Sequence, residues 1–384
     1  MPDPTALRHK VAIVGAAETD SVGVQPDKSM LQLHAESAMN ALRDAGLTPA
    51  DVDGVATAGP SPAAVAEYLG IIPRYVDGTS VGGCSFLIHV RHAVAAIAAG
   101  MVDTVLVTHG ESGRSRVGMA RPAPAPGQPA GQFEAPFGPS GPPSMFSIPV
   151  ARYMKQFGVT EEQLAEVAVS TRKWASLNSK ANMRDPITVD DVLNSRLIAW
   201  PLHLLNCCLV TDGGGALVLV SEERARDFPK KPVYVLGAGE SVEHVSVSRM
   251  RDFWESKAYK TAGENAFRMA GVGIDAIDHT MLYDAFTHTP VYMLEALGIA
   301  KPGEGTEPFV SGRAAPGGDF PINTNGGGLS YTHTGMYGMF AMQESIAQLR
   351  GEAGERQVAD VEVGLVHGAG GMFSAGATLL FSNS

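Results

Sequence analysis

Residues 82–100, GGCSFLIHVRHAVAAIAAG, place a lone cysteine between a pair of glycines and a long apolar run. The pattern predicts a helix over 84–99, which begins at Cys84 and ends before Gly100. The first backbone N–H groups of a helix and its positive dipole end would favour the thiolate of Cys84. A cysteine in an apolar helix also packs well as an ordinary core residue. The stretch therefore predicts either a nucleophile at a sharp turn or a core thiol.

Strand and helix patterns alternate on both sides of this stretch. A helix is predicted over 29–46, because Ser29 is a favoured N-cap residue and Gly46 suits a helix C-terminus. Continuous apolar runs closed by glycine or a turn are typical of buried strands. Such strands are predicted at KVAIVGAAE (10–18), DGVATAG (53–59), TVLVTHG (104–110) and, after a long interruption, GGALVLVSEERA (214–225).

The pattern starts again at KPVYVLGAGE (231–240), which indicates an internal repeat. AGLTPADVD (45–53) aligns with AGVGIDAID (270–278), and each copy lies between a predicted helix and a predicted strand. Two similar βα halves predict an α/β fold made by duplication, with the active site where the halves meet. We expect the first half to span 1–225 and the second half to span 226–384.

Residues of about 113–200 interrupt the first half. The segment 121–143, RPAPAPGQPAGQFEAPFGPSGPP, is so rich in Pro and Gly that no regular helix or strand is expected there. A helix is predicted over 160–178, with Thr160 as its N-cap and acidic residues in its first turn. An insert of this length usually serves as a lid or a binding loop.

The composition excludes several classes of protein. The chain has 384 residues, a formal net charge of −11 and 45% hydrophobic residues, which argues for a large core and against a general nucleic-acid binder. No run approaches the ~20 apolar residues of a membrane-spanning helix, and the N-terminus carries no apolar signal core. The three cysteines, Cys84 and the adjacent Cys207 and Cys208, form no disulfide framework and no zinc spacing. We expect a cytoplasmic protein without a bound metal, in which Cys207 and Cys208 pack in a strand core.

Four stretches taken together resemble the thiolase superfamily, especially its sterol-carrier-type, thiolase-like branch. They are GGCSFLIHVRHAVAAIAAG (82–100), YDAFTH (283–288), NTNGGGLSYTHTG (323–335) and HGAGGMFS (367–374). The resemblance runs over nearly the whole chain. It implies the duplicated thiolase fold, with two βαβαβαββ halves in five layers, α-β-α-β-α, and the long insert within the first half. It also implies that Cys84 is a nucleophile, which attacks a 3-oxoacyl-CoA and holds the acyl group as a thioester.

The resemblance gives roles to three further residues. His333 takes the place of the histidine that donates to the thioester oxygen, although the family's Gly-His-Pro is Thr-His-Thr here. His367 stands where many thiolases have a second cysteine, and an imidazole can move protons in either direction there. Tyr283 replaces the asparagine that holds a catalytic water. Its hydroxyl either supplies the missing donor or simply packs.

Coenzyme A is expected as a co-substrate, and no tightly bound cofactor is expected. The candidates for contact with it are the glycine turn Gly370 and Gly371, together with Asn325, His288 and Lys180. An acidic protein also needs local cations around the phosphates of CoA. The insert offers Arg114, Arg116, Arg121, Arg172, Lys173 and Lys180, although each of them is equally explained as part of a solvated face.

Three functions follow from the resemblance. The first is an acyltransferase that cleaves a 3-oxoacyl-CoA with CoA, for a bulky aromatic, branched or steroid side-chain acyl group such as that of a benzoylsuccinyl-CoA-type thiolase. The second is a retro-aldolase that cleaves a β-hydroxyacyl-CoA through tyrosine and histidine, for which Tyr283, Tyr331 and Tyr337 are available. The third is a non-catalytic scaffold that binds acyl-CoA. The family further implies a homodimer and a small OB-fold, zinc-ribbon partner of the DUF35 type.

Overall fold

The computed structural model describes residues 3–118, 127–139 and 141–384. Within these residues, nine strands form one mixed sheet in the order β3-β2-β4-β7-β1-β8-β11-β10-β9. The first five strands of this order come from the first half of the chain and the last four from the second half. Their bounds are β1 (Val11–Glu18), β2 (Gly54–Thr57), β3 (Tyr75–Asp77), β4 (Thr104–Ser112), β7 (Asp212–Ser221), β8 (Val233–Val242), β9 (His279–Leu282), β10 (Val363–Gly370) and β11 (Ala375–Ser382).

The strand order confirms the duplication. The series β2-β4-β7-β1 of the first half is repeated, in mirror order, by β8-β11-β10-β9 of the second half. The aligned segments fold alike, since β9 begins and ends 225 residues after β2. The counterpart of β3 in the second half is not a full strand: a single parallel bridge between Thr280 and Ile322 stands in its place. The two groups of strands meet at β1 and β8, where only two residue pairs join them.

Alternating side chains divide the core between the two faces of the sheet. In β1, Ala12 and Val14 belong to a smaller hydrophobic cluster with α1 (Met30–Ala45), whereas Val11 and Ile13 face the main cluster. The main cluster contains α3 (Ser85–Ala98), and α11 (Gly338–Arg350) packs against α3. On the far side, α8 (Lys257–Ala270) packs on β8 and β11. The helices and the two strand groups thus form the five expected layers, and α2 (Pro62–Leu69) lies beside α1.

Local signals set the helix ends as expected. Ser29 caps α1 with a reciprocal capping box, and Gly46 ends the helix in the left-handed region, with φ of 70°. Thr160 caps the next predicted helix in the same way. Cys84 is the N-cap residue of α3. The sharp turn at residues 82–84, called the elbow from here on, therefore lies where the sequence places it.

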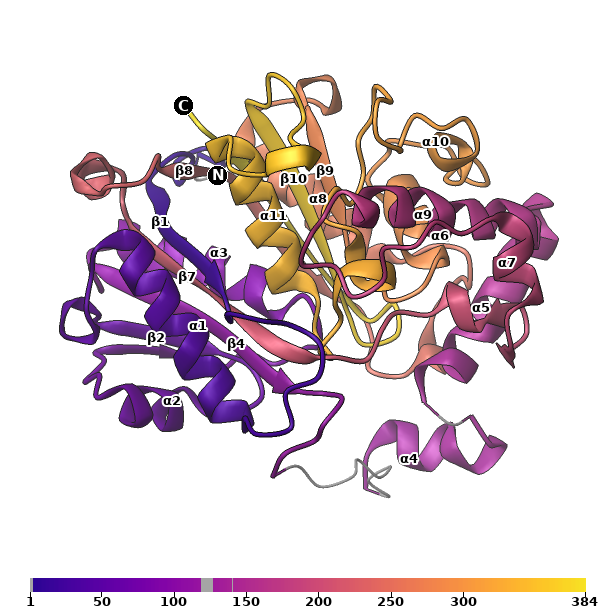
Figure 1. Cartoon of the computed structure of the whole chain (residues 1–384), viewed down its shortest axis with the longest axis horizontal. Coiled ribbons are helices and arrows are strands. Elements are labelled where there is room, and N and C mark those ends of the chain that lie inside the picture. The colour runs from indigo at the N-terminus through magenta and orange to yellow at the C-terminus, as the bar shows by residue number, and fades with distance from the viewer. Residues whose placement is uncertain (1–2, 119–126, 140) are drawn as a thin grey trace.

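The insert forms a separate helical lobe. In Figure 1 its helices α5, α6 and α7 gather beside the second half, at the end of the molecule away from α1 and α2. The expectation of no regular structure over 121–143 is wrong in part, because a short helix and the start of α5 fall within it; residues 121–126 and 140 lie outside the described part. The remaining elements are α4 (Pro129–Phe133), α5 (Pro142–Phe157), α6 (Glu161–Ser176), α7 (Val189–Asn194), β5 (Leu197–Ala199), β6 (Leu202–His203), α9 (His288–Ala296) and α10 (Glu307–Val310).

Candidate active site

A cavity of about 600 Å³ opens where the elbow, the insert and the second half meet. Its walls are largely apolar, and a few polar groups converge on it, a composition typical of small-molecule sites. Gly82 and Gly83 of the elbow and Gly371 of the glycine turn line it. The apolar wall comprises Pro142, Pro143, Phe146, Ile198, Leu204, Leu209, Val210, Ala285, Phe286, Ala369 and Met372.

Cys84 lies beneath this cavity and does not line it. The residue is fully buried, and a side-chain carbon at Gly370 would come within 2.8 Å of its sulfur. Burial raises the pKa of the thiol to about 12. The expected stabilisation of the thiolate by the helix N-terminus is therefore outweighed by desolvation. The glycine turn touches the sulfur through Gly370, while Gly371 reaches the cavity.

Tyr283 and His333 line the cavity as a hydrogen-bonded pair. The phenol oxygen of Tyr283 lies 3.0 Å from Nε2 of His333, and it also accepts the backbone N–H of Tyr337 at 3.1 Å. Burial lowers the pKa of His333 to about 4 and raises the pKa of Tyr283 well above its ordinary value. Both groups are therefore neutral near pH 7. The two residues are 50 positions apart in the sequence. The hydroxyl of Tyr283 thus contacts His333, the predicted donor to the thioester oxygen.

The backbone around the pair is fixed by buried hydrogen bonds. Asp284, next to Tyr283, accepts the N–H groups of Gly328 and Leu329 at 2.6 and 3.3 Å, which holds the turn before His333. Burial raises the pKa of Asp284 to about 8. Thr211 pairs with His333 in both directions, since its hydroxyl accepts the His333 N–H at 3.0 Å and its own N–H donates to the His333 carbonyl at 3.1 Å. The imidazole is therefore anchored through its main chain.

His367 is buried on β10, away from the cavity lining. Its Nδ1 lies 2.7 Å from the hydroxyl of Thr378, and its ring packs edge-on against Tyr259 with the centroids 5.0 Å apart. Its Nε2 has no hydrogen-bond partner among the described residues. Burial lowers the pKa of His367 to about 3, so the imidazole is neutral.

His288 lies in an aromatic cluster and does not reach the cavity. Its ring packs against Phe146, Phe286, Tyr292 and Phe373, and neither nitrogen has a hydrogen-bond partner within the described residues. The side chain is fully buried. The structure thus separates His288 from any CoA that would enter this cavity.

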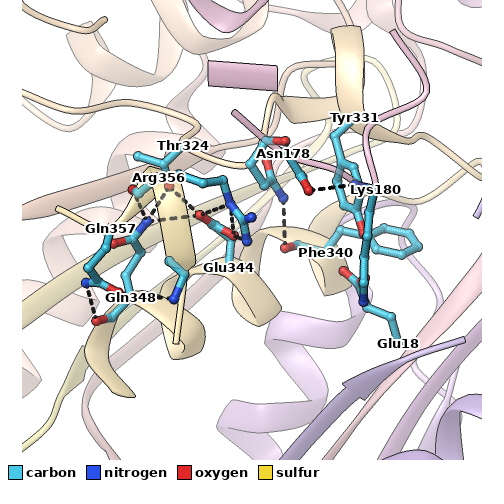
Figure 2. A network of polar contacts seen from close by, with 12 residues as sticks. Glu18, Asn178, Lys180, Thr324, Tyr331, Phe340, Glu344, Gln348, Arg356 and Gln357 are labelled. Carbon is cyan, nitrogen blue, oxygen red and sulfur yellow. Dashed lines mark hydrogen bonds and ion pairs between the residues drawn. The ribbon is translucent and has the colours of Figure 1, made fainter. Parts of the chain in front are cut away.

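Asn325 and Lys180 line a second, smaller and more polar cavity of about 280 Å³. Figure 2 shows the network of polar contacts to which Lys180 belongs. Lys180 is exposed and lies 3.6 Å from Glu18. Deeper in this network, Glu344 on α11 accepts two hydrogen bonds from the guanidinium of Arg356, at 2.8 and 3.1 Å, and one from Thr324 at 2.7 Å. The two predicted CoA contacts therefore belong to a region apart from Tyr283 and His333.

A cluster of charged side chains joins α3 to the sheet. His92 on α3 lies between Asp77 of β3, at 2.7 Å, and Glu240 of β8, at 3.2 Å. Its hydrogen bonds to these two carboxylates raise the pKa of His92 to about 9. His89, one turn earlier, is buried and bonds to the carbonyl of Thr79. Both histidines thus hold α3 in place through hydrogen bonds.

Cys207 and Cys208 correct a prediction. They were expected inside a strand, but β7 begins only at Asp212, and both cysteines line the main cavity. The segment that carries them runs beside residues 285–286, since the N–H of Cys208 donates to the carbonyl of Ala285 at 2.9 Å. Burial raises the pKa of both thiols, so they present a neutral apolar wall.

Only part of the predicted basic rim lies at the main cavity. Arg116 lines it, whereas Arg172 is buried and donates to Ser330 at 2.8 Å and to the carbonyl of Asp185 at 2.9 Å. Arg121 lies outside the described residues. Arg114 and Lys173 are exposed and do not line this cavity.

Glu111, at the end of β4, is a polar residue of the cavity that the sequence motifs did not single out. The signal was available, because a carboxylate follows directly on the buried run TVLVTHG. Strand ends of this kind often carry functional side chains.

Two classes of site find no support within residues 3–118, 127–139 and 141–384. No cluster of three or more His, Cys, Asp or Glu side chains there could hold a metal ion. The same residues contain no helix with the length and apolarity needed to cross a membrane.

Comparisons with known proteins agree with the fold. The family described as "Thiolase C-terminal domain-like" matches residues 239–383. Acetyl-CoA acetyltransferase of Methanothermobacter thermautotrophicus is 31% identical, over 97% of this chain and 99% of its own. The 17-hydroxy-3-oxo-4-pregnene-20-carboxyl-CoA lyase of Mycobacterium tuberculosis is 34% identical, over 97% of this chain and 100% of its own.

A solved structure described as "Ltp2-ChsH2(DUF35) aldolase" has a TM-score of 0.90 and 32% identity, over 98% of both chains. Relatives that match over nearly their whole length thus include an acetyltransferase, a lyase and an aldolase. Together with the duplicated sheet, these matches show that the chain belongs to the thiolase superfamily, in its sterol-carrier-type, thiolase-like branch.

Proposed function

We propose that the protein is a retro-aldolase, which cleaves the bond between the α- and β-carbons of a β-hydroxyacyl-CoA. The observation that carries the proposal is the Tyr283–His333 pair, which lines the main cavity with its two polar atoms 3.0 Å apart. Cys84, the residue on which a covalent route depends, is buried beneath the same cavity. The lyase and aldolase relatives support this reaction class.

The reaction needs a stabilised thioester enolate. Removal of the β-hydroxyl proton turns the C–O bond into a carbonyl, the Cα–Cβ bond breaks, and its electron pair forms the enolate. In the tautomer that carries its proton on Nε2, His333 donates to Tyr283, which also accepts from Tyr337. The phenolic O–H is then directed at the thioester oxygen, where a fixed donor in a dry site is most effective. Protonation at Cα releases the acyl-CoA.

The shape of the cavity fits a bulky substrate. Phe146, Ile198, Leu204, Phe286 and Met372 supply broad apolar surface around the polar pair. The burial of such surface favours a branched, aromatic or steroid side chain, at about 25 cal/mol per Å² of apolar area. Among the described residues that line the cavity, Arg116 carries a positive charge, which suits the phosphates of CoA.

Thiolysis of a 3-oxoacyl-CoA is the second candidate. It is favoured by Cys84 at the N-terminus of α3 and by the acetyl-CoA acetyltransferase relative. This route requires the sulfur to become accessible between Gly83 and Gly370 and to lose its proton. The buried His367 on β10 is the base that the family resemblance offers for it.

A CoA-dependence experiment separates the two reactions. The probe is 2-(1-hydroxycyclopentyl)propanoyl-CoA, called the hydroxycyclopentyl probe below. Its α-carbon carries a methyl group, and its β-carbon is the ring carbon that bears the hydroxyl. Retro-aldol cleavage gives cyclopentanone and propanoyl-CoA without free CoA. Product formation without CoA, retained in Cys84→Ala, supports the proposal. Cleavage of a 3-oxoacyl-CoA that requires CoA, with an acyl adduct on Cys84 in the intact mass, overturns it.

The proposal includes an assembly and a compartment. β3 is an edge strand whose Val76 is 56% exposed, and such an edge is suited to pairing with a second copy of the chain. The exposed Leu204 and Val210 at the cavity mouth would be covered by a partner of the DUF35 type, like the one named together with the related aldolase. All three cysteines are free, which fits the reducing cytoplasm.

Light scattering tests the homodimer. A mass of two chains that falls to one in Val76→Lys supports it, and a monomer at all concentrations contradicts it. Co-expression with a candidate partner, followed by measurement of turnover and KM, tests the second interaction.

A further inference from the structure

The carboxylate of Glu111 projects into the main cavity from the end of β4. Both of its oxygens lie directly over Gly335, where a side-chain carbon would overlap the carboxylate. Gly335 follows His333 by two residues, and its carbonyl lies 3.5 Å from the hydroxyl of Tyr283. Gly335 therefore lies between the carboxylate of Glu111 and the hydroxyl of Tyr283.

Glu111 lacks the hydrogen bonds of a structural carboxylate. Its Oε2 is buried and has no hydrogen-bond partner among the described residues. Asp212, on the neighbouring strand, is the contrast: it accepts hydrogen bonds from the N–H groups of Gln25, Arg114 and Ser115, at 2.8 to 2.9 Å, and from the Ser115 hydroxyl. A buried carboxylate oxygen without a hydrogen-bond partner costs folding free energy. Its presence at a cavity therefore indicates that a polar group of a bound ligand supplies the missing hydrogen bond.

The electrostatics of Glu111 suit proton transfer. Burial raises its pKa to about 7, and the positive charge of Arg116 opposes that rise. The other ionisable groups that line the cavity near it, Tyr283 and His333, are both neutral at this pH. A carboxylate with a pKa near the working pH can both accept and return a proton.

We propose that Glu111 is the general base of the cleavage, an assignment that rests on the proposed retro-aldol function. Its carboxylate takes the proton of the β-hydroxyl as the carbonyl forms and the Cα–Cβ bond breaks. The electron pair of that bond becomes the thioester enolate, whose oxygen accepts from Tyr283. The proton held by Glu111 then passes to Cα, so the ketone and the acyl-CoA leave without any co-reactant.

The test compares Glu111→Gln with Glu134→Gln. Glu134 is buried and, like the half-buried Glu111, has an Oε2 without a hydrogen-bond partner among the described residues, but it does not line this cavity. With the hydroxycyclopentyl probe, Glu111→Gln should lower kcat by roughly 10²-fold to 10⁴-fold and leave KM nearly unchanged. The wild-type rise of kcat/KM with pH, centred near the pKa of Glu111, should vanish in Glu111→Gln and persist in Glu134→Gln. Glu111→Asp should keep the rise at a reduced rate.

The possible results distinguish a failure of the role of Glu111 from a failure of the proposed retro-aldol function. Full activity and an unchanged pH profile in Glu111→Gln, together with a loss of activity in Tyr283→Phe, would overturn the role of Glu111 alone. Absence of probe cleavage by the wild-type enzyme, together with CoA-dependent thiolysis, would overturn the retro-aldol function itself. Matching circular dichroism and thermal unfolding of the variants would show that a lost rate is not a lost fold.

Discussion

Removal of one hydroxyl group, in Tyr283→Phe, tests the candidate site most directly. The phenol oxygen joins Nε2 of His333 at 3.0 Å and the N–H of Tyr337 at 3.1 Å. Its loss leaves two buried polar groups without that partner, at a cost of about 1–3 kcal/mol of unfolding free energy for each group that finds no substitute. The enolate also loses one donor, which should lower kcat by roughly 10²-fold to 10³-fold.

The assay follows ketone release from the hydroxycyclopentyl probe under saturating conditions, and denaturant unfolding gives the stability change. Tyr292→Phe is the matched control, because Tyr292 is also a buried tyrosine with two hydrogen bonds, to the carbonyls of Phe253 and Pro149, and it does not line the cavity. The control should lose stability and keep its rate. A Tyr283→Phe variant with the kcat of the wild type would refute the role of the pair in catalysis.

Three further predictions concern other parts of the molecule. Cys84→Ala should retain retro-aldol turnover within a few fold, and a complete loss of turnover with an unchanged circular dichroism spectrum would favour the covalent route. The pKa of His92 is raised to about 9 against an ordinary value of 6.5, so its stabilisation is complete below 6.5 and is lost as pH rises through 9. Denaturant unfolding should show this decline, and His92→Asn should flatten it. Arg356→Leu leaves Glu344 as an uncompensated buried charge, which should cost about 3–5 kcal/mol in the same assay, and a change below about 1 kcal/mol would contradict a buried ion pair at this position.

Much of the scaffold could be predicted from the sequence, because its signals are local. The apolar run of β1, the capping box at Thr160 and the repeat that relates β2 to β9 all depend on neighbouring residues. The duplicated α/β fold followed from the repeat and the turn at Cys84 from residues 82–100, whereas the five layers followed from the family resemblance. The Pro- and Gly-rich insert was harder, because proline is tolerated in the first turn of a helix, where α5 begins at Pro142.

The candidate site was only partly predictable, because its geometry depends on long-range packing. Sequence motifs singled out Tyr283 and His333 separately, but the 3.0 Å contact between them depends on the turn that Asp284 holds. The burial of Cys84 depends on the close approach of Gly368 and Gly370 from the second half of the chain. Desolvation of this kind reverses the pKa shift expected from a helix dipole, and no spacing in the sequence reports it.

The glycines beneath the cavity constrain how a new substrate preference could arise in this fold. A methyl group at Gly83 would overlap the ring of Tyr283, and one at Gly370 would collide with the carbonyl of Val81. A side chain at either position would therefore force a ring or the backbone to move, so we expect few substitutions in the floor to be tolerated. The outer wall differs, since Ile198, Leu204 and Met372 are large apolar residues, which smaller or larger apolar residues can replace. Divergence among paralogues should accumulate in this wall, so that one conserved reaction centre serves acyl groups of different shapes.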